Sequence, residues 1–125
     1  AFVFISVETK RLQNYLRTFR KRTGLSQDEI AFLLGCQSGS KVSRCERLRR
    51  VPNLETALAY EVIFRVPVRE LFAGLFEKVE RKTIRRVGQL ARKLHNSKGD
   101  RFSERKLEAL AVAVREAGKV LRQRQ

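Results

Sequence analysis

The sequence is poor in the residues that build enzymes, metal sites and disulfide frameworks. Its 125 residues include two cysteines, Cys36 and Cys45, and one distant histidine, His95. These three residues match neither a metal-ligand pattern nor a disulfide framework. No serine stands in the glycine-flanked turn of a serine hydrolase, and there is no glycine-rich phosphate loop. We therefore expect no catalytic residue, no metal and no cofactor, and we interpret His95 as a surface residue.

Long hydrophobic runs are also missing. No apolar stretch approaches the roughly 18 residues that a membrane-spanning helix needs. The opening AFVFISVE is apolar over only a few residues and lacks the basic leader of a signal peptide. The sequence therefore predicts a protein without a membrane segment, and a cytoplasmic location is the expectation.

Acidic residues are scarce relative to basic ones. The chain has 13 Asp and Glu against 28 Lys and Arg, a formal net charge of +15 at pH 7. A positive field of this size attracts polyanions, of which nucleic acid is the commonest. A membrane surface or an acidic protein partner could use the same charge, so charge alone does not choose among them.

Apolar residues recur at helical spacing from residue 9 onward. The first helix is predicted over residues 9 to 22 and ends at Gly24. Its inward-facing residues are expected to be Leu12, Tyr15, Leu16 and Phe19. A second helix begins at Gln27, because Ser26 and Glu29 form a capping box, and it ends at Gly35. Its predicted apolar face consists of Ile30, Ala31, Leu33 and Leu34.

Three further short helices are predicted before residue 77. The third runs from about Ser40 to Arg47, and the fourth follows Pro52 with Asn53 as its cap. The residues expected to point inward from the fourth helix are Leu54, Ala57, Leu58, Val62 and Ile63. Pro67 stands in the first turn of the fifth helix, where proline is tolerated. Its inward residues are predicted to be Leu71, Leu75 and Phe76.

The pattern changes after residue 76. A basic helix is predicted within residues 78 to 98, with an apolar stripe formed by Ile84, Val87, Ala91 and Leu94. Asn96, Ser97 and Gly99 should end it, and Ser103 should cap a last helix. The stripe of that helix consists of Leu107, Leu110, Ala111, Val114 and Leu121. We predict an all-α protein with a five-helix domain over residues 9–76 and a basic helical hairpin over residues 77–125.

The stretch from Leu16 to Phe72 resembles the Xre-type helix-turn-helix domain of Cro and phage-repressor proteins. The motifs that carry the resemblance are Gly24-Leu25-Ser26-Gln27-Asp28-Glu29-Ile30-Ala31, Leu34-Gly35, Val42-Ser43-Arg44-Cys45-Glu46, Pro52 and Val66-Pro67-Val68-Arg69-Glu70-Leu71. The resemblance implies five helices, of which the third lies in the major groove of DNA. One difference is that seven residues separate Gly35 from Ser43, where the common pattern has six.

The same resemblance implies which residues meet DNA. Small polar side chains at the start of the third helix permit close approach to bases, and Arg44 could pair with a guanine. Gln27 matches a position that typically holds a phosphate. The predicted DNA-binding residues are Gln27, Gln37, Ser38, Gly39, Ser40, Lys41, Ser43, Arg44, Arg47, Arg49 and Arg50.

Two pairs of residues have structural roles in this interpretation. Arg20 and Glu46 match an ion pair that in relatives ties the first helix to the end of the third. Cys36 and Cys45 match apolar core positions, with a redox switch as the alternative. Leu48 and Arg65 stand where relatives often have glycine. We therefore expect both helix ends to terminate without an easy left-handed residue, for instance through a longer loop.

The basic surface beyond residue 76 has more than one interpretation. Residues 77–125 carry 15 basic and 6 acidic residues, against 13 and 6 in residues 10–76. Extra phosphate contacts, solvated surface and binding to an acidic protein remain open. The possible phosphate contacts are Arg81, Lys82, Arg85, Arg86, Arg92 and Lys93. Residues 2 to 5, FVFI, could form a β arm that crosses to a partner, a strand on the core or a vector remnant.

These features predict a sequence-specific, DNA-binding transcriptional regulator of bacterial or phage type. Its partner would be double-stranded DNA, bound by a homodimer whose seam is the stripe of residues 107 to 121. One alternative is an antitoxin that binds a toxin protein. Another is an accessory or RNA-binding protein that uses its charge without reading sequence.

Overall fold

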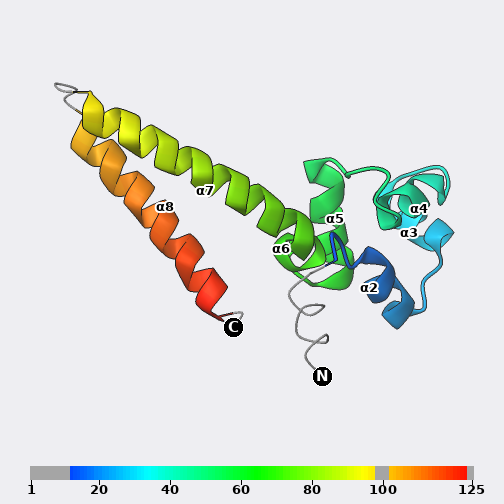
Figure 1. Cartoon of the computed structure of the whole chain (residues 1–125). Coiled ribbons are helices and arrows are strands. Elements are labelled where there is room, and N and C mark those ends of the chain that lie inside the picture. The colour runs from blue at the N-terminus through cyan, green and yellow to red at the C-terminus, as the bar shows by residue number, and fades with distance from the viewer. Residues whose placement is uncertain (1–11, 98–101, 124–125) are drawn as a thin grey trace. The chain divides into compact units, whose positions relative to one another are not determined.

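The computed structural model describes residues 12–97 and 102–123, with side chains described as far as Gly118. Within these ranges the chain forms seven helices and no strand, so the all-α prediction is confirmed (Figure 1). The helices are α2 (Leu16–Thr23), α3 (Gln27–Leu34), α4 (Ser40–Glu46), α5 (Leu54–Phe64), α6 (Val68–Leu71), α7 (Ala73–Asn96) and α8 (Ser103–Gln123). The FVFI segment proposed as a β arm lies outside the described residues.

Local capping signals set most of the helix ends as predicted. The Ser26 hydroxyl accepts the Glu29 N–H at 3.0 Å, and the Glu29 carboxylate accepts the Ser26 N–H at 2.9 Å. Asn53 caps α5 by accepting the Thr56 N–H at 2.9 Å. Gly24 and Gly35 end α2 and α3 with φ values of 79° and 76°, a conformation that glycine adopts without steric cost.

The first helix begins later than predicted. Helix α2 starts at Leu16 rather than near residue 9, and Leu12, predicted to face inward, is 57% exposed. The Tyr15 N–H donates to the Leu71 carbonyl at 2.7 Å, and the Leu12 carbonyl accepts the Gly74 N–H at 2.9 Å. These bonds to a distant segment replace the helical bonds that residues 12–15 would otherwise make, which explains the shift.

The core of the first five helices is small and fully enclosed. Its largest completely buried side chains are Tyr60, Leu16, Ile30, Leu71 and Val42. Three residues predicted to point inward from α5 are instead exposed, namely Leu54 (72%), Leu58 (48%) and Val62 (59%), and so is Leu33 of α3 (51%). Helix α5 is apolar on nearly every side, so its hydrophobic pattern does not identify the face that Ala57 and Tyr60 bury.

Two helices end in left-handed residues that are not glycine. Leu48, after α4, has φ 67°, and Arg65, after α5, has φ 55°. As expected, neither end has a residue that adopts this conformation easily, yet both helices end in it. A side chain in this conformation costs roughly 1–2 kcal/mol. The Arg65 N–H still donates to the Glu61 carbonyl at 2.8 Å, which ends α5 in the way that a glycine would.

The chain divides into two compact units, residues 1–76 and 77–125. Helix α7 begins at Ala73, so Leu75 and Phe76 belong to its first turn and not to the preceding helix as predicted. Further along α7, the predicted stripe of Ile84, Val87, Ala91 and Leu94 is half-buried.

Helix α8 differs from its prediction at its first turn. Ser103 is the first helical residue, and no described group bonds its buried hydroxyl, so Ser103 is not the predicted cap. Along the predicted stripe, Leu107 and Leu110 are half-buried, whereas Ala111 and Val114 are exposed. The side chain of Leu121 lies outside those described.

Candidate nucleic-acid interface

A wide cleft of about 910 Å³ opens where the N-terminal end of α3 meets the turn before α4. Its walls come from α3, the turn, the outer face of α4 and the segment after α4. The lining residues are Arg20, Ser26, Gln27, Asp28, Ser38, Gly39, Ser40, Ser43, Arg44, Arg47 and Arg49. Most of the residues predicted to bind DNA, which are spread over 23 positions from Gln27 to Arg49 in the sequence, therefore share one surface.

Three of the predicted residues lie outside this cleft. Gln37 is exposed and does not line this cleft. Lys41 and Arg50 line a separate, smaller cavity of about 90 Å³ between α4 and α5. The cleft thus contains a subset of the predicted residues, in which three serines are followed along the chain by three arginines.

The charge of the cleft is strongly positive. Arg44, Arg47 and Arg49 are exposed along one wall, and Asp28 is the single acidic residue among those that line the cleft. Arginine presents a fixed fork of donors that suits phosphate oxygens and the acceptor edge of guanine. Chemically, the arrangement fits a polyanion whose edges carry hydrogen-bond acceptors.

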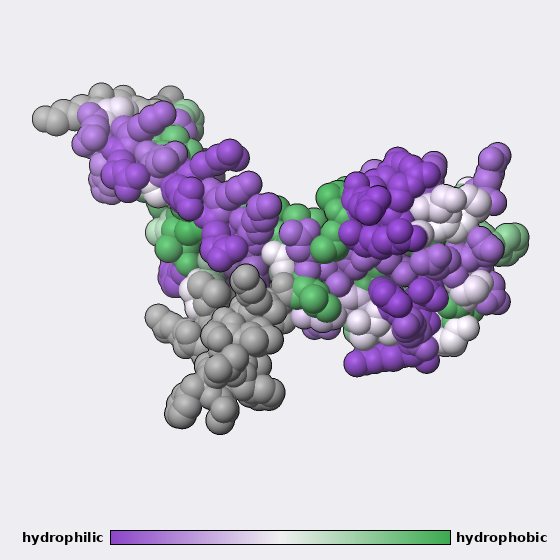
Figure 2. All heavy atoms as spheres, turned by 45° about the vertical axis from the view of Figure 1, so that its right-hand side comes forward, coloured by the Kyte–Doolittle hydropathy of each residue, from purple (hydrophilic) through white to green (hydrophobic). Residues whose placement is uncertain are grey.

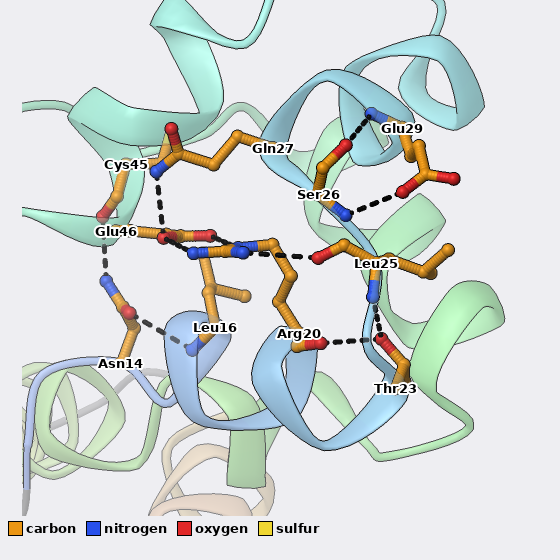
Figure 3. A network of polar contacts seen from close by, with 10 residues as sticks. All are labelled: Asn14, Leu16, Arg20, Thr23, Leu25, Ser26, Gln27, Glu29, Cys45 and Glu46. Carbon is orange, nitrogen blue, oxygen red and sulfur yellow. Dashed lines mark hydrogen bonds and ion pairs between the residues drawn. The ribbon is translucent and has the colours of Figure 1, made fainter.

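Helix α4 is held at its C-terminal end by a buried ion pair. The Arg20 Nε donates to Glu46 Oε2 at 2.7 Å, and its Nη2 donates to Oε1 at 3.1 Å (Figure 3). The two side chains are 14% and 3% exposed. This hydrogen bond raises the pKa of Arg20, against the opposing effect of burial, so the guanidinium stays charged. The predicted pair is present, and it connects α2 to α4.

Two more side chains extend this network. The Gln27 Nε2 donates to Glu46 Oε1 at 3.2 Å, which fixes the amide of a predicted phosphate ligand at the edge of the cleft. Asn14 donates to the Cys45 carbonyl at 2.9 Å and accepts the Leu16 N–H at 3.2 Å (Figure 3). The role of Asn14 was not predicted. Its position two residues before a helix was the available signal, since Asn commonly caps helix starts.

The N-terminal end of α4 is held differently. The Gly39 N–H donates to Asp28 Oδ1 at 2.9 Å, across eleven positions of sequence. Gly39 is buried, and a Cβ atom placed on it would lie 2.8 Å from that oxygen. The sequence did not predict this partner of Asp28, because the partner is set by tertiary structure. Both ends of α4 are therefore fixed to α2 and α3.

Comparison with known proteins agrees with this geometry. Residues 11–72 match a family model described as a helix-turn-helix domain, a family of Xre-like domains. Residues 11–72 are a helix-turn-helix domain of this family. The predicted resemblance is confirmed over that range. No curated protein and no solved structure matches the chain.

The two cysteines of the helix-turn-helix domain lie on the wall of the smaller cavity. Cys45 is buried and Cys36 is half-buried, and both are free thiols. Burial raises the pKa of Cys45, as expected of a core thiol. Tyr60 lines the same cavity with its hydroxyl unbonded by any described group, and burial raises its pKa as well. Among the described residues, no three His, Cys, Asp or Glu side chains gather as a metal site.

Beyond the helix-turn-helix domain, α7 presents a basic surface. Its six predicted phosphate-contact residues are all exposed, namely Arg81, Lys82, Arg85, Arg86, Arg92 and Lys93. Figure 2 shows hydrophilic side chains along the visible length of this helix. His95 is exposed in its last turn. No described helix is long and apolar enough to pass through a bilayer.

Proposed function

We propose that the protein is a sequence-specific DNA-binding transcriptional regulator of bacterial or phage type, acting in the cytoplasm. The observation that carries the proposal is the arginine-rich cleft along α4, a helix that is fixed at both ends to its neighbours. A rigid helix with small hydroxyl side chains at its start can approach base edges closely. The helix-turn-helix family supports DNA binding in general, and sequence reading is the further step that we propose.

In this function the cleft residues divide into two roles. Ser38, in the turn before α4, and Ser40, Ser43 and Arg44, on α4 itself, face the bases, and Arg44 reads a guanine. Gln27, Arg47 and Arg49, together with Lys41 and Arg50 outside the cleft, contact phosphates and fix the protein on the duplex. One amide hydrogen of Gln27 is used by Glu46, and the second remains for a phosphate oxygen.

The basic face of α7 adds phosphate contacts that do not depend on sequence. Each neutralised phosphate releases counterions, so every such phosphate steepens the salt dependence of binding. Replacing Arg81, Lys82, Arg85 and Arg86 by glutamine in the full chain should lower the slope of log K against log salt by about 0.9 for each phosphate that the variant no longer neutralises. An unchanged slope would assign this surface to solvent or to another partner.

A homodimer on a two-fold operator completes the proposal, because a dyad presents two recognition helices about one helical turn apart. The candidate seam is the α8 stripe that contains Leu107 and Leu110. Val114, on the same stripe, is 45% exposed and therefore available for a second copy.

The decisive experiment is a selection from a random duplex library at about 150 mM salt, where nonspecific binding is weak. An enriched motif with inverted symmetry would establish a dimeric regulator and give its half-site spacing. An enriched motif without symmetry would keep sequence reading and remove the dimer. No enrichment, with DNA still bound at low salt, would refute sequence reading. An antitoxin or an accessory nucleic-acid-binding protein would then be the better description.

A further inference from the structure

The glycine at the start of α4 is required by space rather than by backbone conformation. Gly39 has φ −70°, which any residue adopts. A Cβ atom there would meet Asp28 Oδ1 at 2.8 Å, Gln27 Cβ at 3.1 Å and the Asp28 nitrogen at 3.2 Å. Two of these three atoms are backbone or the first side-chain atom, so they cannot move aside by a rotamer change. The start of α4 therefore rests directly on the start of α3.

Asp28 is unusual in its surroundings. It is the second residue of α3, and its Oδ1 also accepts the Gly39 N–H at the start of α4. One carboxylate thus serves the N-terminal ends of two helices, where a negative charge is favourable. The same carboxylate lies in a cleft whose other charged residues are arginines. A negative charge there repels phosphates, so it lowers affinity for DNA of any sequence.

Because Asp28 lowers affinity for DNA, we expect this residue to contribute to DNA binding in another way. We propose that Asp28 and Gly39 are positioning residues that set the depth and register of α4 in the major groove, and so determine specificity. The proposal rests on the proposed function. The bond and the close approach hold the N-terminal end of α4, where Ser40 lies, and the turn before it that carries Ser38. The other end of α4 is held independently by Asn14 and by the Arg20–Glu46 pair. Loss of the Asp28 bond therefore leaves the domain folded but frees the end of α4 that meets the bases.

Two substitutions separate the hydrogen bond from the charge. Asp28→Asn removes the charge but keeps an oxygen that can accept the Gly39 N–H. Asp28→Ala removes both. Glu55→Gln is a matched charge control, because Glu55 is an exposed acid in the first turn of α5 and does not line the cleft. Gly39→Ala tests the close approach of the two helices without any change of charge.

Binding to a selected site and to a random duplex gives the first measurement. Asp28→Ala and Asp28→Asn should both bind random DNA about two- to fivefold more tightly, since a repulsive charge is gone. Only Asp28→Ala should lose about tenfold or more on the selected site. Gly39→Ala should lose a similar factor on the selected site and nothing on random DNA. Glu55→Gln should leave the ratio of the two affinities unchanged.

Amide exchange of Gly39, measured by NMR without DNA, gives the second measurement. The Gly39 N–H should be protected in the wild type and in Asp28→Asn, and exposed in Asp28→Ala, whose domain stays folded with a melting temperature only a few degrees lower, since one buried N–H loses its partner. If the library selection finds no site, this result still tests the positioning bond, so the two proposals fail separately.

Three outcomes would overturn the proposal. The first is a loss for Asp28→Ala that is equal on both duplexes. The second is a selected-site loss for Asp28→Asn as large as that for Asp28→Ala, which would make the charge decisive. The third is an Asp28→Ala domain that is largely unfolded at the temperature of the binding assay, which would make the role structural. If Gly39→Ala does not fold, the comparison of the two Asp28 variants still tests whether the hydrogen bond determines specificity.

Discussion

The two units of the chain carry similar amounts of positive charge but place it by different means. In the first unit, tertiary contacts decide where each cation points. Arg20 is fixed in a buried pair with Glu46, while Arg44, Arg47 and Arg49 line one cleft. In the second unit, the periodicity of α7 alone puts its cations on one face. None of the side chains described between residues 77 and 118 is fully buried.

This difference suggests that the first unit reads bases and that α7 attracts phosphates. Base reading requires donors held within a few tenths of an ångström, and that precision needs a core behind them. Phosphate attraction acts over about 10 Å and tolerates mobile side chains. We therefore expect substitutions in the first unit to change fold and specificity, and substitutions in α7 to change affinity for all sequences alike.

The largest effect should come from breaking the buried pair. Arg20→Ala leaves Glu46, which is 3% exposed, without its cationic partner. Removal of one partner from a fully buried pair typically costs 3–5 kcal/mol, and we expect about 2–3 kcal/mol here, because this pair is only partly buried and Gln27 still bonds Glu46. Urea unfolding measures this loss. Arg17→Ala, an exposed arginine of the same helix, should change stability by less than about 0.5 kcal/mol. Similar losses of unfolding free energy for both variants would show that the Arg20–Glu46 pair does not stabilise the fold more than an exposed arginine does.

A second comparison sets one arginine of each unit against the other. Arg44→Ala should reduce discrimination at one base pair by roughly 1–3 kcal/mol. Arg85→Ala should weaken binding to selected and random duplexes by the same factor and lower the salt slope by about 0.9. Titrations on both duplexes at several salt concentrations measure the two effects. Equal losses on both duplexes for both variants would refute this assignment of base reading and phosphate attraction to the two units.

A smaller effect is expected at Tyr60, whose hydroxyl is buried without a described partner. Tyr60→Phe should stabilise the protein by about 1 kcal/mol at neutral pH, because it removes an unpaired polar group. Tyr15→Phe is the control that should not stabilise, since the Tyr15 hydroxyl accepts the Leu12 N–H at 3.3 Å. A net loss for Tyr60→Phe in urea unfolding would show that its hydroxyl is bonded in solution.

The same residue predicts a pH dependence. Burial raises the pKa of folded Tyr60 above its ordinary value of 10.0. The folded state therefore favours the protonated phenol, and this contribution is complete below about pH 10. It is lost as the pH rises toward the folded pKa, because the unfolded chain releases the proton first. Unfolding free energies at pH 8 and at about pH 10.5 should differ less for Tyr60→Phe than for the wild type.

The smallest effect concerns the left-handed residue after α5. Arg65→Gly should stabilise the protein by about 0.5–1 kcal/mol, since glycine removes the steric cost but gains entropy in the unfolded chain. Arg65→Ala keeps the left-handed Cβ and should give no gain. A destabilised glycine variant would show that the Arg65 side chain makes a compensating interaction.

The sequence predicted those features that depend on neighbouring residues. The capping box of Ser26 and Glu29, the glycine ends at Gly24 and Gly35 and the Asn53 cap are all local, and all are confirmed. The start of α2 was missed because residues 12–15 bond to Leu71 and Gly74, which are distant in sequence. The inward face of α5 was missed because an evenly apolar helix does not reveal which neighbours it meets.

The candidate site also contains features that the sequence predicted and features that it did not. The resemblance supplied most of the residues that line the cleft and the Arg20–Glu46 pair, because motifs shared with relatives carry tertiary information. It did not supply Asn14 or the bond between Asp28 and Gly39. Asp28 looks in sequence like any acidic residue of a helix start. Its second partner depends on how the turn of residues 35–39 folds back onto α3.

Helix α7 begins inside the helix-turn-helix core, so the core and the basic extension share one helix. Ala73 is 2% exposed and Leu75 packs on the core of the helix-turn-helix domain, although the family match ends at residue 72. The last piece of that core is therefore the first turn of the helix that becomes the basic extension. One isolated turn is a poor helix nucleus, so the residues that follow help to keep it folded. A segment that replaces this extension is therefore expected to support that turn best if it continues the helix past Phe76.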